Sequence, residues 1–324
     1  MNMNYSQSWV VTGAAGFLGS HVVEKLLNCG ESVIGIDNFF SGSKEFIKPF
    51  LDNPNFIFYE MDIRDVNELT VLFQNHQPSI VVHLAAIHFI PAAVADPTLT
   101  VSLNVHGTQC VLTAARVAGV KNFWFASTGD VYKPSELPHQ EDSIIEPFNI
   151  YGLTKLMGEQ LLKLESKHQP SAKFVIGRLF NLYGVRETNP HIIPEIIQQI
   201  RQQPNKPLFL GNLWPLRDMV PVEEAASAVI ESIQKAPIGI TTVNIASGVA
   251  HSMEELIEIM GKILGKPIEV KIDPAKIRSV ERSHLQADVS KLKKLIGWTP
   301  HSDVYRGLKN LLMIEDSTQE NLIT

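Results

Sequence analysis

The first 180 residues alternate between two kinds of apolar pattern. Short runs rich in valine, isoleucine and phenylalanine predict buried strands at residues 9–13, 32–37, 56–63, 79–86, 121–127 and 173–179. Longer segments, in which apolar residues recur every three or four positions, predict helices at residues 17–29, 65–76, 100–118 and 149–166. Alternation of this kind favours a parallel sheet with right-handed crossovers. We therefore predict an α/β fold, a doubly wound parallel sheet of the Rossmann type.

The pattern loosens after about residue 180. Prolines become frequent between residues 190 and 221, and further helices are predicted at residues 222–234, 253–264 and 303–313. We interpret residues 1–180 as a first domain and residues 181–324 as mainly a smaller C-terminal α/β domain for the substrate. The chain is expected to return to the first domain near residues 220–246.

Composition and charge narrow the class of protein. Of the 324 residues, 44% are apolar and 19% are charged, which is typical of a globular chain. A net charge of −6 without a run of lysine or arginine excludes an evident surface for nucleic acid or an anionic membrane. The first residues do not resemble a signal peptide, and no apolar run approaches the length of a membrane span. Cys29 and Cys110 are too few for a disulfide scaffold, so we expect a cytoplasmic protein.

A glycine-rich segment directly follows the first predicted strand. In TGAAGFLGSH (residues 12–21), Gly13, Gly16 and Gly19 stand between that strand and the next predicted helix. Glycines there allow a tight turn and bring the backbone close to a pyrophosphate, which binds the amides at the helix N-terminus. Asp37 ends the second strand, where a carboxylate accepts hydrogen bonds from a ribose 2′-hydroxyl and repels a 2′-phosphate. The segment predicts a dinucleotide site that prefers NAD to NADP.

Three polar residues are candidates for catalysis. Tyr151 and Lys155 are four residues apart in a predicted helix, so both side chains project from one face. A lysine ammonium beside a phenol, with an oxidised nicotinamide nearby, favours the phenolate and lowers the tyrosine pKa, which makes Tyr151 a candidate general base for a sugar or alcohol hydroxyl. Thr128 lies at the end of the preceding strand, in ASTGDVYKP (residues 126–134), and its hydroxyl can bond the same substrate oxygen.

Taken in order, the motifs resemble those of the extended short-chain dehydrogenases/reductases. The similar segments are VVTGAAGFLGSH, HLAA, NVHGT, STGDVY, YGLTK, GRLFNLYG, LRDMVPVEEAA, NIASG and ADVSKLKKLIGWTP. Within this family the chain is most similar to the NAD-dependent nucleotide-sugar epimerases and dehydratases, of the UDP-glucose 4-epimerase type. The resemblance implies NAD as cofactor, a nucleotide sugar as substrate, and a homodimer formed through the helices near residues 100–118 and 149–166.

The resemblance also assigns roles to individual residues. Cofactor contacts are implied for Gly13, Gly16, Phe17, Leu18, Asp37, Asn38, Asp62, Ile63, Leu84, Ala85, Ala86, Asn104, Tyr151 and Lys155. Asn104 would support the site from its helix, and Asp62 by itself is more typical of a helix cap. Substrate contacts are implied for His88, Thr128, Asn181, His191, Arg217, Arg278 and Glu281.

Arg217 and Arg278 would together grip the substrate diphosphate, as paired arginines do. The structural alternatives are a salt bridge between Arg217 and Asp218 and a solvated loop charge at Arg278; for His88 the alternative is plain packing. We predict no metal site, because other histidines lack ligand-like spacing and acidic or cysteine partners; these are His83, His106, His139 and His251.

The reaction depends on the step that comes after hydride removal from sugar C4. A 4-epimerase turns the 4-keto sugar over and returns the hydride to its other face, whereas a 4,6-dehydratase needs further protonatable groups. Dehydratases similar to this chain usually carry Thr followed two residues later by Glu, and here Thr128 and Gly129 precede Asp130. We interpret Asp130 as a turn residue and expect a 4-epimerase, with a dehydratase that uses Asp130 as an extra acid or base as the alternative.

Two further alternatives concern the class of protein. A non-catalytic NAD-binding sensor would typically lack Tyr151 or Lys155, and both are present. An ordinary dehydrogenase that releases NADH is disfavoured by Arg217 and Arg278, which suit a diphosphate. A UDP-hexose, hexosamine or uronic acid is the expected substrate, and Leu285, intermediate in size, does not decide whether an N-acetyl group is admitted.

Overall fold

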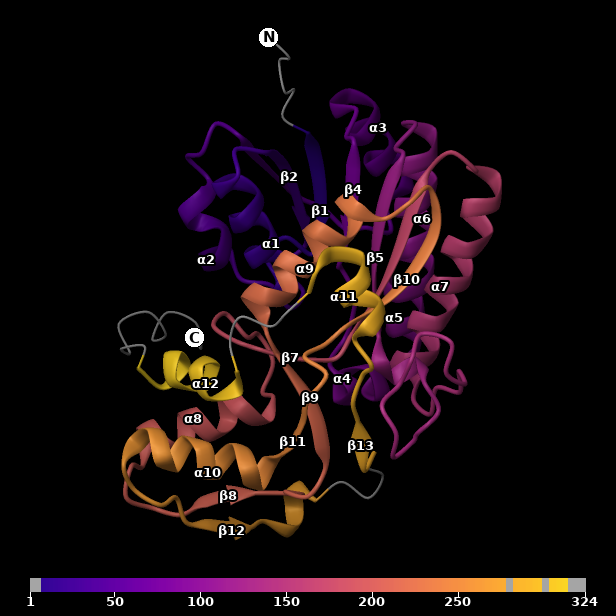
Figure 1. Cartoon of the computed structure of the whole chain (residues 1–324). Helices are drawn as coiled ribbons and strands as arrows, with labels where there is room; N and C mark the ends of the chain where they lie inside the picture. The colour runs from indigo at the N-terminus through magenta and orange to yellow at the C-terminus, as the bar shows by residue number, and fades with distance from the viewer. Residues whose placement is uncertain (1–6, 278–281, 299–302, 314–324) are drawn as a thin grey trace.

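The computed structural model describes residues 7–277, 282–298 and 303–313, and a seven-stranded parallel sheet forms its centre (Figure 1). The strand order is β10-β6-β5-β4-β1-β2-β3. The strands are β1 (Ser8–Thr12), β2 (Ser32–Asp37), β3 (Phe56–Glu60), β4 (Ile80–His83), β5 (Asn122–Thr128), β6 (Lys173–Leu179) and β10 (Gly239–Ile245). Thr12 lies opposite Ile36 of β2 and His83 of β4, so the carboxyl ends of these three strands meet at one edge.

Helices cover both faces of this sheet. One face carries α1 (Phe17–Asn28), α9 (Val222–Lys235) and α11 (Ser290–Ile296), and the other carries α3 (Val66–His76), α6 (Thr108–Val117) and α7 (Ile150–His168). Two separate buried clusters of apolar side chains, one on each face, fix the helices to the strands. Shorter elements connect them: α2 (Lys44–Ile47), η1 (Lys48–Phe50), α4 (Ile90–Ala95), α5 (Pro97–Val101), the π-helical η2 (Ser102–Gly107) and η3 (Gly129–Val131).

A smaller lobe lies beyond the carboxyl edge of the sheet, at the lower left of Figure 1. Its helices are α8 (Ile192–Gln202), α10 (Met253–Leu264) and α12 (Val304–Met313), with the short η4 (Pro274–Lys276). Its strands are β7 (Asn181–Tyr183), β8 (Leu208–Leu210), β9 (Leu216–Pro221), β11 (Ala250–Ser252), β12 (Val270–Ile272) and β13 (His284–Leu285). A third buried cluster, formed by residues of α8, α10 and α12 with the nearby strands, is the core of this lobe.

The predicted doubly wound α/β fold is confirmed. Some strands and helices have other bounds than predicted. The strands predicted at residues 56–63 and 79–86 end earlier, at Glu60 and His83, because residues 61–63 and 84–86 leave the sheet. Helix α8 was not predicted; Pro194 stands in its first turn, where a missing N–H costs little. Among the described residues, no helix has the length and apolar character needed to cross a bilayer.

Candidate active site

A cavity of about 1360 Å³ lies between the carboxyl edge of the large sheet and the smaller lobe. Gly13, Asp37 and Tyr151 line it from the side of the sheet, and Arg217 and Met253 line it from the smaller lobe. Because both parts of the chain contribute to its wall, the cavity can hold a ligand that contacts both. In an open parallel sheet, ligands are expected to bind at the carboxyl ends of the strands, which is where this cavity lies.

The glycine-rich loop forms a narrow cradle at one end of the cavity. Gly13 has a φ of 73°, and a Cβ atom placed on it would lie 2.9 Å from the backbone nitrogen of Ala85. A Cβ on Gly19 would lie 1.8 Å from the carbonyl oxygen of Gly13. Helix α1 begins at Phe17, so its free N-terminal amides face the same space. The cradle therefore fits the pyrophosphate of a dinucleotide, as predicted.

Asp37 is held in place by the turns around it. Its carboxylate accepts hydrogen bonds from the backbone N–H of Ala15 at 3.0 Å and of Phe39 at 2.8 Å. Burial raises the pKa of Asp37, and these backbone hydrogen bonds oppose that rise. The residue lines the cavity next to Asn38, so an acceptor is available to a ribose at this point.

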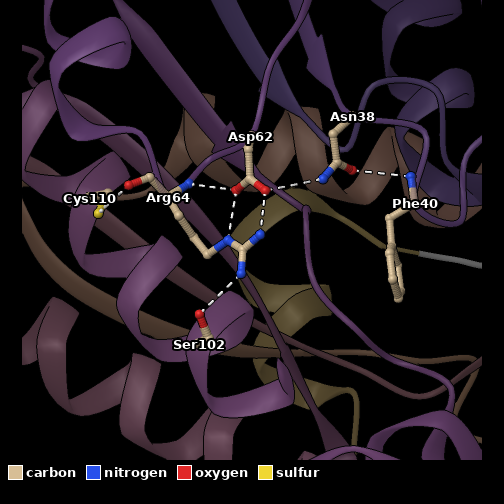
Figure 2. A network of polar contacts seen from close by, with 6 residues as sticks. All are labelled: Asn38, Phe40, Asp62, Arg64, Ser102 and Cys110. Atoms are coloured by element: carbon tan, nitrogen blue, oxygen red, sulfur yellow. Dashed lines mark hydrogen bonds and ion pairs between the residues drawn. The ribbon is translucent and has the colours of Figure 1, made fainter. Parts of the chain in front are cut away.

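Asp62 belongs to a polar network beside the cavity, shown in Figure 2. Its carboxylate accepts hydrogen bonds from the Arg64 guanidinium at 3.0 and 2.7 Å and from the Asn38 amide at 3.4 Å. These Arg64 hydrogen bonds hold the pKa of Asp62 below its usual range. The alternative interpretation as a helix cap is wrong, because Asp65 caps α3. Of these two predicted cofactor contacts, Asp62 and Ile63, only Ile63 lines the cavity.

Asn104 lies behind the cavity wall. It is buried in the π-helical η2, and its amide donates to the carbonyl of Ile87 at 2.9 Å and to the Thr154 hydroxyl at 3.0 Å. Its side-chain oxygen accepts from the Ile87 N–H at 2.8 Å. Asn104 thus ties Ile87, which directly follows the cavity-lining residues 84–86, to α7, and it supports the site without lining it.

The predicted Thr128, Tyr151 and Lys155 come together in the cavity wall. Thr128 ends β5, and its hydroxyl bonds the phenol of Tyr151. Burial raises the pKa of Tyr151, the nearby Asp130 carboxylate raises it further, and the Thr128 hydrogen bond opposes both. Burial lowers the pKa of Lys155 to about 7. Burial therefore dominates the pKa of both groups in the protein without NAD, and the lowering expected from the lysine together with an oxidised nicotinamide stays a prediction.

Asp130 combines a turn backbone with a carboxylate on the cavity side. Its N–H donates to the Thr128 hydroxyl at 3.2 Å within η3, as expected for a turn residue. The residue is only partly buried and lines the cavity, where its charge acts on Tyr151 and on Arg282. Gly152 of α7 lets the turn approach closely, since a Cβ there would lie 2.5 Å from the Asp130 carbonyl oxygen. The turn interpretation is therefore incomplete, because the carboxylate is part of the site.

Arg282 is a cavity residue that the sequence did not reveal. It precedes β13 and is 4% exposed, and its guanidinium donates to the carbonyls of Gly129 and Tyr132 on either side of Asp130. It also stacks on the Phe148 ring, 5.0 Å from the ring centroid. Burial lowers the pKa of Arg282, whereas the Asp130 carboxylate raises it. The predicted Arg278 and Glu281, a few residues earlier, lie outside the described residues.

Arg217 and Asn181 stand where a diphosphate is expected. Both line the cavity from the smaller lobe, and the side-chain oxygen of Asn181 is buried without a hydrogen-bond partner in the described part of the chain. Asp218, the alternative salt-bridge partner of Arg217, instead accepts hydrogen bonds from Ser247, Gly248 and Ala287. The strand alternation places Asp218 on the other face of β9. This leaves the Arg217 side chain on the cavity side.

His88 and His191 also line the cavity, and the structure adds Glu187 close to both. The His88 and His191 rings stack with their centroids 6.3 Å apart. Burial lowers the pKa of His88 to about 4 and raises the pKa of Glu187 to about 7. His88 lines the cavity, and its contact with the substrate stays a prediction beside the alternative of plain packing. Sequence spacing could not have predicted that Glu187 lies close to His88.

The fold and the site together define a class of protein. A Rossmann-type sheet, a glycine cradle after β1 and a buried threonine, tyrosine and lysine around one cavity are the features of short-chain dehydrogenases/reductases. A family model described as GDP-mannose 4,6 dehydratase matches residues 10–311. The chain therefore belongs to this family of nucleotide-sugar enzymes within the extended short-chain dehydrogenases/reductases, as its motifs predicted.

Individual relatives are 4-epimerases by name. The UDP-glucuronate 4-epimerase of Thermodesulfobacterium geofontis (strain OPF15) is 31% identical over 309 residues, which are 93% of this chain and 94% of the relative. The structure of UDP-glucuronic acid 4-epimerase from Bacillus cereus with UDP-glucuronic acid and NAD has a TM-score of 0.84 at 30% identity and covers 94% and 97% of the two chains. UDP-glucose 4-epimerase from Bifidobacterium longum, solved with NAD+ and UDP, has a TM-score of 0.87 at 26% identity, with coverage of 98% and 100%.

Proposed function

We propose that the protein is an NAD-dependent 4-epimerase of a UDP-sugar. The observation that carries the proposal is the set of Thr128, Tyr151 and Lys155 in one cavity wall, next to a glycine cradle that fits a dinucleotide. Named 4-epimerases align with nearly the whole chain, and solved neighbours contain NAD. NAD is accordingly the cofactor, and Gly13, Asp37 and the segment at residues 84–86 would hold it.

Tyr151 would act as the general base. It takes the proton from the C4 hydroxyl of the sugar, while the Thr128 hydroxyl hydrogen-bonds the same oxygen and fixes its position. NAD, when bound, supplies the acceptor for the C4 hydride and a positive charge that favours the phenolate of Tyr151. Lys155, buried beside them, would bind the nicotinamide ribose. After the 4-keto sugar turns over, Tyr151 returns the proton to the C4 oxygen of the inverted product.

The smaller lobe would hold the nucleotide part of the substrate. Arg217 and Asn181 line the cavity wall there, and the Arg217 guanidinium and the Asn181 amide N–H are donors from which diphosphate oxygens could accept. A diphosphate binds arginine through two parallel hydrogen bonds, so Arg217 would anchor it while the sugar turns over. Arg278 and Glu281 remain expectations of the family resemblance for the diphosphate and the nucleotide ribose.

One observation favours a second candidate function. The Asp130 carboxylate lines the cavity near Tyr151, at the position where dehydratases similar to this chain usually carry a glutamate. In a 4,6-dehydratase it would help remove the C5 proton and the C6 hydroxyl. The relatives named above are 4-epimerases, and we therefore keep dehydration as the alternative.

Product analysis tests the proposal. Purified protein is incubated with UDP-glucose, UDP-glucuronic acid, UDP-N-acetylglucosamine and a GDP- and a dTDP-hexose, and the products are identified by NMR and mass spectrometry. We expect a sugar inverted at C4 with unchanged mass from at least one UDP-sugar. A product lighter by one water would replace the epimerase by the dehydratase. Binding of NAD without conversion of any sugar would indicate a sensor.

We further propose a division of labour and an assembly. Residues 1–180, with the returning segment near 220–246, would bind NAD, and the remainder would mainly bind the nucleotide sugar. The exposed apolar side chains Leu153, Met157 and Leu164 of α7 support a homodimer formed through this helix. The proposed dimer would work in the cytoplasm. Sedimentation of the purified protein tests the assembly directly.

A further inference from the structure

Three metal-ligating side chains converge at the cavity wall. They are His88, which follows β4, and Glu187 and His191, which lie between β7 and α8. One ligand atom of each residue lies within 4.8 Å of those of the other two. All three line the cavity and are only partly buried, so an ion from solution can reach them. Two imidazoles and a carboxylate are the donors that divalent transition metals prefer.

The His88 ring is held in the tautomer that a metal ligand requires. The Asn189 amide donates a hydrogen bond to His88 Nε2 at 3.0 Å, so this nitrogen is the unprotonated one and its lone pair is available to an ion that displaces the amide. The ring also donates to the backbone carbonyl of Ala86, and the donor must be the other nitrogen, Nδ1. A histidine that binds metal through Nε2 usually donates its Nδ1–H to such a carbonyl, which orients the ring.

The Glu187 carboxylate is held by backbone groups in the described part of the chain. It accepts hydrogen bonds from the backbone N–H of Asn189, at 3.2 Å, and of Thr188. Among the described residues, no lysine or arginine forms an ion pair with it. A carboxylate removed from water without a counter-charge is costly, and a cation bound beside it would offset that cost.

We propose that His88, Glu187 and His191 bind one first-row divalent transition metal ion. Three protein ligands leave at least one coordination position of the ion open, and this position would face the cavity. The Asn189 amide now bonded to His88 would move aside. Metal binding of this kind does not depend on which sugar reaction the protein catalyses. If the three residues instead contact the substrate directly, no metal ion binds at this place.

Cobalt binding to the full chain tests the proposal. Protein without a polyhistidine tag is treated with a chelator, dialysed and titrated with Co²⁺, which gives visible absorption bands in nitrogen and oxygen coordination. Zn²⁺ is then added as a competitor, and calorimetry gives the stoichiometry. We expect one Co²⁺ per chain that Zn²⁺ displaces. Wild-type protein with no saturable site would overturn the proposal.

Variants locate the site. His88→Asn and His191→Asn should each weaken Co²⁺ binding at least about 10-fold, the smallest loss seen even when only a supporting residue is removed. His251→Asn is the matched control, because His251 pairs with Glu255 at 3.4 Å outside the cavity and its loss should leave the affinity unchanged. Equal affinity in all three variants would show that the ion binds elsewhere and would refute the site.

A near-isosteric variant distinguishes the loss of a metal ligand from misfolding. Glu187→Gln keeps the shape of the side chain and removes the charge, and we expect the same loss of Co²⁺ affinity with an unchanged circular dichroism spectrum. Unchanged affinity in Glu187→Gln would overturn the role of this carboxylate. Because every readout is metal binding, failure here leaves the product analysis of the proposed epimerase untouched.

Discussion

Replacing Asp130 by asparagine separates the two interpretations of this residue. The substitution keeps the size of the side chain and the turn of η3, whose hydrogen bond runs from the residue 130 backbone to Thr128. It removes the negative charge that raises the pKa of Tyr151. We therefore expect Asp130→Asn to lower the Tyr151 pKa and to keep C4 inversion largely intact at neutral pH.

The size of the shift follows from the charges around Tyr151. Two unit charges about 8 Å apart, at an effective dielectric constant of about 20, interact by roughly 2 kcal/mol. Asp130 is only partly buried and also faces Arg282, so solvent and this guanidinium reduce the effect by about a third. A remaining ~1.4 kcal/mol corresponds to about one pKa unit. The removed negative charge disfavoured the phenolate, so the sign of the change is downward.

The assay is the pH dependence of kcat/KM, with C4 inversion followed by NMR. Since Tyr151 must be deprotonated to act as base, the acidic limb of the profile should move down by about one pH unit in Asp130→Asn. Glu146→Gln, which removes a negative charge at the surface beside Lys133, should leave the limb in place. A limb that stays or moves upward would refute the electrostatic reasoning. Loss of turnover with NAD and substrate still bound would make Asp130 a catalytic residue.

Three further predictions concern the same helix. Tyr151→Phe should abolish turnover with NAD binding retained, and a variant that still inverts C4 would exclude the phenol as base. Burial lowers the Lys155 pKa from 10.5 to about 7, so between these pH values the unfolded chain binds more protons. NAD-free protein should therefore become more stable in urea as pH rises from about 7 to 10.5. Lys155→Met should flatten this dependence, and an unchanged slope would contradict it. Glu159→Gln leaves Arg178 buried without its counter-charge and should cost roughly 3–5 kcal/mol of unfolding free energy, against less than ~1 kcal/mol for the exposed partner in Lys163→Gln.

The parts of the fold set by local pattern could be predicted from the sequence. The strands at residues 32–37 and 173–179 and the helix at 253–264 have the bounds that their apolar periodicity indicates. The glycine cradle was also predictable, because a strand, a glycine turn and a helix follow one another directly in the chain. Thr128 and Tyr151 were placed by their position at a strand end and a helix start.

The rest of the site depends on tertiary contacts that no short segment encodes. Arg282 reaches the cavity because β13 pairs with β9, a strand far away in the sequence. Glu187 meets His88 through the loop that follows β7. The effect of burial on the pKa of Tyr151 was likewise hidden, since spacing shows which residues are neighbours and not how much water surrounds them.

The Arg282 contacts have a consequence for engineering. This arginine comes from the segment just before β13, yet it braces the backbone on both sides of residue 130 through the carbonyls of Gly129 and Tyr132. A chimaera could join the C-terminal lobe of a relative to residues 1–180 of this chain in order to change the sugar preference. Such a chimaera would lose the Arg282 hydrogen bonds to the turn that contains Asp130. A successful graft must keep an arginine here or supply another donor to the two carbonyls.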